Sequence, residues 1–193
     1  MFLSSINAAI LFLINTLFDL YILVLMLRFI LTLVGVNYLN SFSQTIIKLT
    51  QPIVLPLKRL KIPNIKQIET ATLLLILAFE IIKYILVGFI SGTSFHILGI
   101  IILSIVNTLK LFIDVFFYAI LIQVILSWLK SSYSPIIQIL FQITQPILRI
   151  FHRLIPPVNG IDLSPIAALI SLQLINIILI KPLSFFATGL TFG

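Results

Sequence analysis

Four long apolar stretches decide what this chain can fold into. They cover residues 2–36, 71–90, 97–128 and 163–180, and each reaches or exceeds the roughly 17–25 residues that a membrane-spanning helix needs. A transmembrane β-barrel would instead show alternating segments of about ten residues. The sequence therefore predicts an all-α, polytopic transmembrane protein with four helical spans.

The first and third stretches are longer than a single span requires. A helix over either would be about 50 Å long at 1.5 Å per residue, so it is tilted, protrudes from the bilayer or breaks into two pieces. A break in the third stretch would fall near Asn107, Thr108 and Lys110, where polar residues interrupt it. Five spans is the alternative that such a break would create.

The basic residues indicate how the spans are oriented. Of the 12 Lys and Arg residues, nine lie outside the spans, and eight of these fall between spans one and two or between spans three and four. Loops rich in Lys and Arg remain in the cytoplasm. We therefore expect both loops in the cytoplasm and both termini outside, an asymmetry that an odd number of spans would lose.

A short motif occurs twice in the chain. Thr50-Gln51-Pro52-Ile53 recurs 94 residues later as Thr144-Gln145-Pro146-Ile147. The same spacing relates Arg59-Leu60 to Arg153-Leu154 and Pro63 to Pro157. Ile68-Glu69 aligns with Ile161-Asp162 after a shift of one residue, and Asp19 corresponds to Asp114. The chain therefore divides into two repeats, residues 1–95 and 96–193. Because each holds two spans, the repeats are parallel.

Each repeat is expected to carry an amphipathic helix on the cytoplasmic side, over residues 40–60 and 134–154. Asn40 and Ser134 are suitable capping residues, and the apolar residues that follow alternate with polar ones. We expect these helices to lie flat at the membrane interface. Pro52 and Pro146 are predicted to end them, since proline lacks the backbone N–H and clashes with the preceding turn.

Charged residues inside the spans are the first candidate site. They are Asp19, Arg28, Glu80, Lys83, Lys110 and Asp114, whose charges sum to zero. Glu80 and Lys83, and likewise Lys110 and Asp114, each share a helix face and are expected to pair. Asp19 and Arg28 point to opposite faces, so Asp19 needs a partner on another helix.

This intramembrane charge network has two interpretations. Charges in the bilayer core are costly, so they pair to hold helices in register or line a water-filled path. The register-holding role is the favoured one, with Arg28 and Lys110 extending toward the interfaces. An ion path through four spans would require a homo-oligomer.

The basic loops are the second candidate site. Lys58, Arg59, Lys61, Arg149 and Arg153 lie next to the spans, where they are expected to contact anionic lipid headgroups or a membrane partner. Nucleic acid is not expected, because aromatic residues for base stacking are not clustered there. The 193 residues include no cysteine, and His96 and His152 are far apart, so no catalytic site, metal site or cofactor is predicted.

The doubled motif closely resembles the YggT family of bacterial and plastid membrane proteins, which includes the plastid YlmG-type relatives. The resemblance rests on the two Thr-Gln-Pro-Ile motifs with their following prolines, together with Asn159-Gly160-Ile161-Asp162 and Ser164-Pro165. It implies a multi-pass protein of the bacterial inner membrane without established enzymatic activity. It also implies links to osmotic tolerance, potassium uptake, cell division or envelope organisation, and, in plastids, to haem attachment and nucleoid distribution.

Two functional hypotheses follow. The first is a non-enzymatic membrane scaffold or envelope-organisation factor, linked to osmotic tolerance, that contacts lipids or a cell-division partner through its basic loops. The second is a small potassium- or proton-handling protein that uses the intramembrane charges. The scaffold is slightly favoured.

Overall fold

The computed structural model describes residues 2–36, 40–59, 68–128, 135–155 and 162–193, and every regular element in these ranges is a helix. In chain order the helices are α1 (Phe2–Val34), α2 (Ser41–Arg59), α3 (Thr70–Ser91), α4 (Ile97–Trp128), α5 (Pro135–Leu154), α6 (Ser164–Ile175), the π-helical turn η1 (Asn176–Ile180) and α7 (Lys181–Phe192). The predicted all-α class is confirmed.

Four helices are long and apolar enough to cross a membrane: Ser5–Val34, Thr70–Ser91, Ile97–Ser127 and Ser164–Phe192. α1 and α4 are each continuous, so the break considered near Asn107 is absent from α4. Polar residues there are accommodated within the helix, since the Thr108 hydroxyl donates to the Ser104 carbonyl at 2.8 Å.

The fourth of these helices corrects a predicted boundary. The apolar stretch was expected to end at residue 180, before Lys181 and Pro182, yet α6, η1 and α7 form one helix that continues to Phe192. The backbone N–H of Lys181 donates to the Asn176 carbonyl, five residues back. This wider turn lies directly before Pro182, so the chain passes the proline without a break.

The helices between the spans also correct a prediction. Asn40 caps α2 as expected, with its Oδ1 accepting the Phe42 N–H at 3.0 Å. Pro52 and Pro146, however, lie inside α2 and α5 rather than at their ends. Each helix buries one face against the spans, and this burial offsets the hydrogen bond that each proline removes. Ser134 and Lys61 lie outside the described residues.

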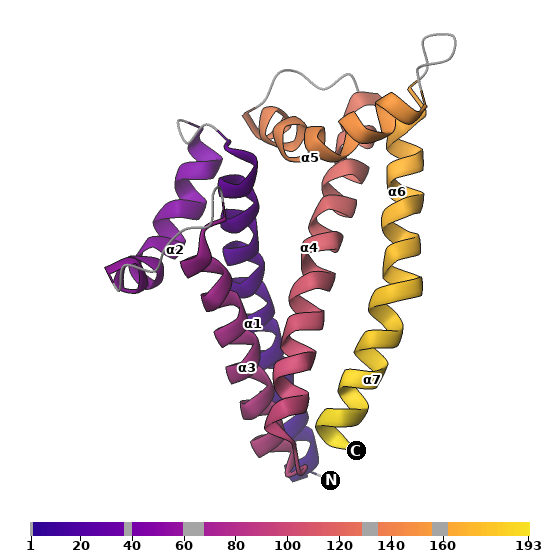
Figure 1. The fold of residues 1–193 in the computed structure, drawn as a ribbon. Helices are drawn as coiled ribbons and strands as arrows, with labels where there is room; N and C mark the ends of the chain where they lie inside the picture. The colour runs from indigo at the N-terminus through magenta and orange to yellow at the C-terminus, as the bar shows by residue number, and fades with distance from the viewer. Residues whose placement is uncertain (1, 37–39, 60–67, 129–134, 156–161) are drawn as a thin grey trace.

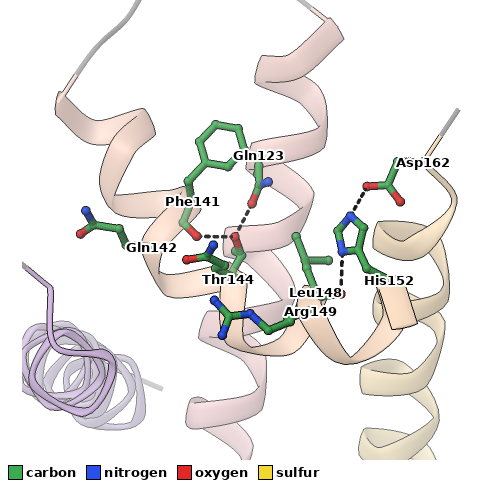
Figure 2. Close-up of a pocket in the computed structure, with 9 residues that line it drawn as sticks. Gln123, Phe141, Gln142, Thr144, Leu148, Arg149, His152 and Asp162 are labelled. Atoms are coloured by element: carbon green, nitrogen blue, oxygen red, sulfur yellow. Dashed lines mark hydrogen bonds and ion pairs between the residues drawn. The ribbon is translucent and has the colours of Figure 1, made fainter. Parts of the chain in front are cut away.

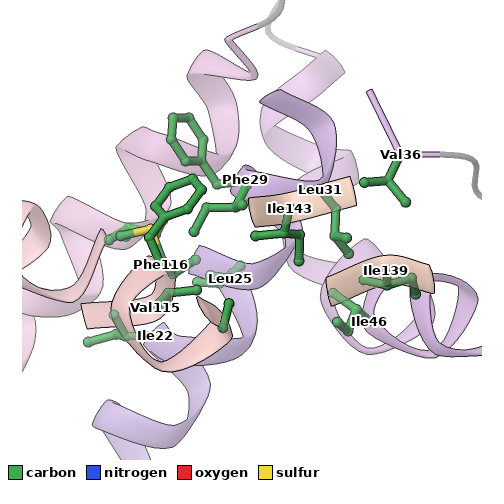
Figure 3. Packing of buried hydrophobic residues seen from close by; sticks show 14 of the residues in the cluster. Ile22, Leu25, Phe29, Leu31, Val36, Ile46, Val115, Phe116, Ile139 and Ile143 are labelled. Carbon is green, nitrogen blue, oxygen red and sulfur yellow. The ribbon is translucent and has the colours of Figure 1, made fainter. Parts of the chain in front are cut away.

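The main hydrophobic core joins both halves of the chain (Figure 3). α1 packs against α4 through Ile22, Leu25 and Phe29, which meet Val115 and Phe116. The same cluster includes Ile46 of α2 together with Ile139 and Ile143 of α5. α2 and α5 therefore cover the spans at one end of the molecule, while the two chain termini lie at the opposite end (Figure 1).

Close backbone packing holds the end with the termini. A Cβ atom on Gly99 of α4 would lie 2.6 Å from the Thr191 Cα of α7, and the backbone N–H of His96 donates to the Thr191 carbonyl at 3.0 Å. α1 and α3 diverge from α4 with distance from this end (Figure 1), and polar side chains of all three helices line a cavity.

Candidate functional site

A charged cavity lies between α1, α3 and α4, about halfway along these helices. Its volume is about 360 Å³, and its polar lining comprises Asp19, Glu80, Lys83, Asn107, Lys110 and Asp114 together with Tyr84. Five of the six charged residues that the sequence places inside the spans therefore face one space. Arg28 is the exception.

Lys83 connects two carboxylates in this cavity. Its Nζ lies 2.8 Å from Asp19 Oδ1 on α1 and 2.7 Å from Glu80 Oε2, one turn back on α3. The side chains of Lys83 and Glu80 are buried, whereas that of Asp19 is 62% exposed in a single copy of the chain. Asp19 thus has the partner on another helix that its position required.

The second half of the chain contributes a separate group. Lys110 Nζ lies 2.7 Å from Asp114 Oδ2 on the same helix, as predicted from their spacing. The other oxygen of Asp114 accepts a hydrogen bond from Asn176 Nδ2 at 3.1 Å. Asn176 opens the π-helical turn η1, so the irregular turn in the fourth span carries a side chain that fixes the Asp114 carboxylate.

The charges around this cavity do not cancel. Asp19, Glu80 and Asp114 contribute three negative charges and Lys83 and Lys110 two positive ones, which gives a formal charge of −1 when all five are ionised. Asn107 and Tyr84 are hydrogen-bonded to each other across α4 and α3. In a low-dielectric membrane, an uncompensated negative charge attracts a proton or a small cation.

Arg28 belongs to a second cluster, at the end of α1 near α2. Its Nε and Nη2 donate to the two carboxylate oxygens of Glu69 at 3.1 and 3.0 Å, and its Nη1 donates to Thr50 Oγ1 at 2.9 Å. Lys58 Nζ lies 2.5 Å from Glu69, and the Thr72 hydroxyl donates to Glu69 at 2.7 Å. Glu69 itself is only 3% exposed.

Electrostatics in this buried cluster favour the ionised carboxylate. Burial alone would raise the pKa of Glu69, but hydrogen bonds from Arg28, Lys58 and Thr72 lower it to about 2. A carboxylate that accepts several charge-assisted hydrogen bonds is strongly held in its ionised form. The cluster therefore ties α1, α2 and the start of α3 together at one end of the spans.

The second half has a related arrangement around a pocket of about 430 Å³ between α4, α5 and the start of α6 (Figure 2). Gln123 of α4 and Thr144 of α5 are hydrogen-bonded to each other. His152 Nε2 lies 2.8 Å from Asp162 Oδ2, and the backbone N–H of Ser164 donates to Asp162 Oδ1 at 2.9 Å. Burial raises the pKa of Asp162, but the contacts with Ser164 and His152 lower it overall.

These contacts correspond in sequence between the two halves. Gln123 follows Arg28 by 95 positions, Thr144 and His152 follow Thr50 and Lys58 by 94, and Asp162 follows Glu69 by 93. The residues in contact at the cavity show nearly the same spacing, because Asp114 follows Asp19 by 95 positions and Asn176 follows Lys83 by 93. In the buried cluster and in the cavity alike, the first half has Arg28, Lys58 or Lys83 where the second half has Gln123, His152 or Asn176.

The predicted basic residues are placed unequally. Lys58 pairs with Glu69, while Arg59, Arg149 and Arg153 are exposed near the ends of α2 and α5. Lys61 lies outside the described residues. His96 is exposed near the start of α4. Within the described ranges, no group of three His, Cys, Asp or Glu residues is arranged to hold a metal.

Sequence reasoning missed Glu69 as a site residue. A usable signal was present, since an acidic residue precedes the second span of each half, at Glu69 and Asp162. Thr50 and Thr144 could also have been identified from the sequence, because both open the repeated Thr-Gln-Pro-Ile motif. Their hydroxyls contact Arg28 and Gln123, respectively.

Four long apolar helices, three of which line a charged cavity, indicate a helical membrane protein. Comparison with known proteins identifies the family: the profile of the CCB3/YggT family matches residues 7–90 and 102–183. The chain belongs to this family, as the doubled motif predicted. No solved structure matches the chain.

Several relatives match over most of their length. The chain is 39% identical to an uncharacterised protein of Pseudomonas aeruginosa over 93% of this chain and 92% of the relative. It is 36% identical to the uncharacterised protein YggT of Escherichia coli, over 86% of each chain. A plastid relative from Arabidopsis thaliana, YlmG homolog protein 2, is 34% identical over 37% of this chain and 28% of its own.

Proposed function

We propose that this protein handles a proton or a potassium ion within the membrane. The observation that carries the proposal is the net charge of −1 around the cavity lined by Asp19, Glu80 and Asp114. One monovalent cation, bound among these carboxylates, would neutralise the cavity. The relatives that match most of the chain are uncharacterised, so they name no ion.

The exposure of Asp19 favours a homo-oligomer. A charged side chain facing lipid near the bilayer centre costs roughly 2.5–3.5 kcal/mol on insertion scales, and the Asp19 side chain is 62% exposed in a single copy. A second copy packed on this side of α1 would cover Asp19 and close the cavity toward lipid. The proposed cation site then lies between copies.

The first expected result concerns ion flux. In liposomes that contain the purified protein, the wild type should carry potassium or proton flux above the level of protein-free vesicles, measured with ion-sensitive dyes. Asp114→Asn and Asp19→Asn should each abolish this flux, because the cavity would lose its negative charge. Lys48→Gln, which removes an exposed charge of α2 away from the cavity, is the matched control and should retain it.

Two results would contradict the proposal. One is wild-type flux no greater than that of empty liposomes in both assays. The other is a flux through Asp114→Asn equal to that of the wild type, when thermal unfolding in detergent shows that the variant is folded. Either result would leave the charges with a structural role only, since holding helices in register needs no ion movement.

A scaffold role is the second candidate, and one observation favours it. α2 and α5 lie at the same end of the molecule (Figure 1), and Arg59, Arg149 and Arg153 are exposed there. We propose that this end meets anionic headgroups or a membrane partner, including one of the cell-division machinery. Envelope organisation and osmotic tolerance would follow from that contact. In neither proposal is the protein an enzyme.

We further propose a multi-pass protein of the bacterial inner membrane, with two parallel repeats (1–95 and 96–193) and both termini outside. The supporting observation is that α2 and α5 lie at the end opposite to the termini, as basic cytoplasmic loops require. In this arrangement α2 and α5 are the interfacial helices of the two repeats.

This topology predicts a labelling pattern. Single-cysteine variants at Lys58 and Arg153 should react with a membrane-impermeant thiol reagent only after the cell is opened, whereas one at Ser91 should react in intact cells. The chain has no native cysteine, so each variant reports one position. Labelling of positions 58 and 153 from opposite sides would overturn the parallel four-span arrangement.

A further inference from the structure

The pocket beside α5 contains a histidine in an unusual hydrogen-bonding position. His152 Nδ1 lies 2.7 Å from the Leu148 backbone carbonyl, and its Nε2 lies 2.8 Å from Asp162 Oδ2 (Figure 2). A carbonyl oxygen and an ionised carboxylate can only accept hydrogen bonds. The His152 ring therefore lies between two acceptors, and Asp162 has contacts with both His152 and Ser164.

The pocket also contains a guanidinium. Asp162 already has partners in His152 and Ser164, and Arg149 lies one turn before His152 on α5. Arg149 has no ion-pair partner among the described residues. Gln142 and Gln145 line the same space and add neutral amide donors. This set of donors fits a single negative charge.

The first half of the chain shows why this space is open. There the guanidinium of Arg28 donates to Thr50 and Glu69 and satisfies the equivalent carboxylate. In the second half the position of Arg28 is taken by Gln123, which reaches Thr144 and leaves a pocket of about 430 Å³. Arg149 also has no basic counterpart, since the residue 94 positions earlier is Leu55.

We propose that this pocket binds the phosphodiester headgroup of a membrane phospholipid, with Arg149 and the glutamine amides as donors. A phosphodiester carries one negative charge, which matches the single guanidinium of Arg149. Arg is well suited to phosphate oxygens because its N–H groups form a planar fork. α5 lies at one end of the long helices (Figure 1), and its residues line this pocket, where Phe141 and Leu148 supply an apolar wall beside the polar groups. Free phosphate, with its higher charge and no apolar part, fits this lining less well.

Native mass spectrometry of the full chain in detergent tests the proposal. Titration with phosphatidylglycerol should show one tightly retained lipid per wild-type chain. Arg149→Gln should weaken its retention by about tenfold or more, as expected for loss of a charge-assisted hydrogen bond. Replacing both Gln142 and Gln145 with alanine should weaken it as well, because this removes the neutral amide donors of the same pocket. Lys48→Gln, which removes an exposed charge of α2 that does not line the pocket, should bind as the wild type does.

Three results would overturn the proposal. Equal weakening by Arg149→Gln and Lys48→Gln would indicate general attraction to a basic surface. Full retention by Arg149→Gln would place the lipid elsewhere. Displacement of the lipid by inorganic phosphate at equal concentration would identify free phosphate, and not a phospholipid, as the ligand. Because the pocket is separate from the cavity around Asp114, failure here would leave the cation proposal standing.

Discussion

Replacement of Glu69 by glutamine is expected to lower the free energy of unfolding by about 3–5 kcal/mol, the range for breaking one side of a buried ion pair. Arg28 is 8% exposed and donates two hydrogen bonds to Glu69. An amide in place of the carboxylate leaves the guanidinium buried without a counter-charge. Lys58 loses the same partner, although its greater exposure lets water replace part of that interaction.

Denaturant unfolding of the purified protein in a mild detergent measures this effect. The informative control is the double variant Arg28→Gln with Glu69→Gln, which makes this cluster resemble the neutral Gln123–Thr144 contact of the second half. The double variant should recover part of the lost stability, because no unpaired charge remains. A loss below about 1 kcal/mol for Glu69→Gln would mean that the cluster behaves as an exposed ion pair.

The helical class and the long apolar helices were predictable because hydropathy reports directly on membrane spans. Ion pairs within one helix were predictable too, since Glu80–Lys83 and Lys110–Asp114 depend only on helical spacing. The Arg28–Glu69 pair was not, because it joins residues 41 apart in sequence. Helix rotation and the course of the connecting segment decide such a contact, and neither can be read from apolar content.

Prolines caused the main errors in predicted helix ends. Pro52 and Pro146 are predicted to end their helices, yet both lie inside them, and the span expected to end at residue 180 continues through Pro182. A proline stops a helix when nothing offsets the lost hydrogen bond. Here the burial of α2 and α5 against the spans, and the π-helical turn before Pro182, make the longer helices favourable. Such tertiary compensation is absent from local sequence rules.

Acidification is expected to destabilise the protein through Glu69. Its pKa lies near 2 in the folded protein and at 4.5 without its partners. The unfolded chain therefore binds a proton more readily than the folded one as the pH falls through this window. The contribution of Glu69 is fully present above pH 4.5 and is lost as the pH falls toward about 2. A pKa difference of about 2.5 corresponds to about 3 kcal/mol.

Unfolding free energies measured between pH 6 and pH 2.5 in a non-ionic detergent would show this loss. Glu69→Gln has no carboxyl group to protonate at this position, so its stability should depend less on pH than that of the wild type. Asp162, whose pKa is also lowered by its partners, acts in the same direction, and Asp162→Asn separates its share. If the wild type and Glu69→Gln instead gave parallel curves, Arg28 and Lys58 would not be holding Glu69 ionised. The predicted loss of stability in Glu69→Gln would then lose its electrostatic basis as well, because both predictions depend on the same buried carboxylate.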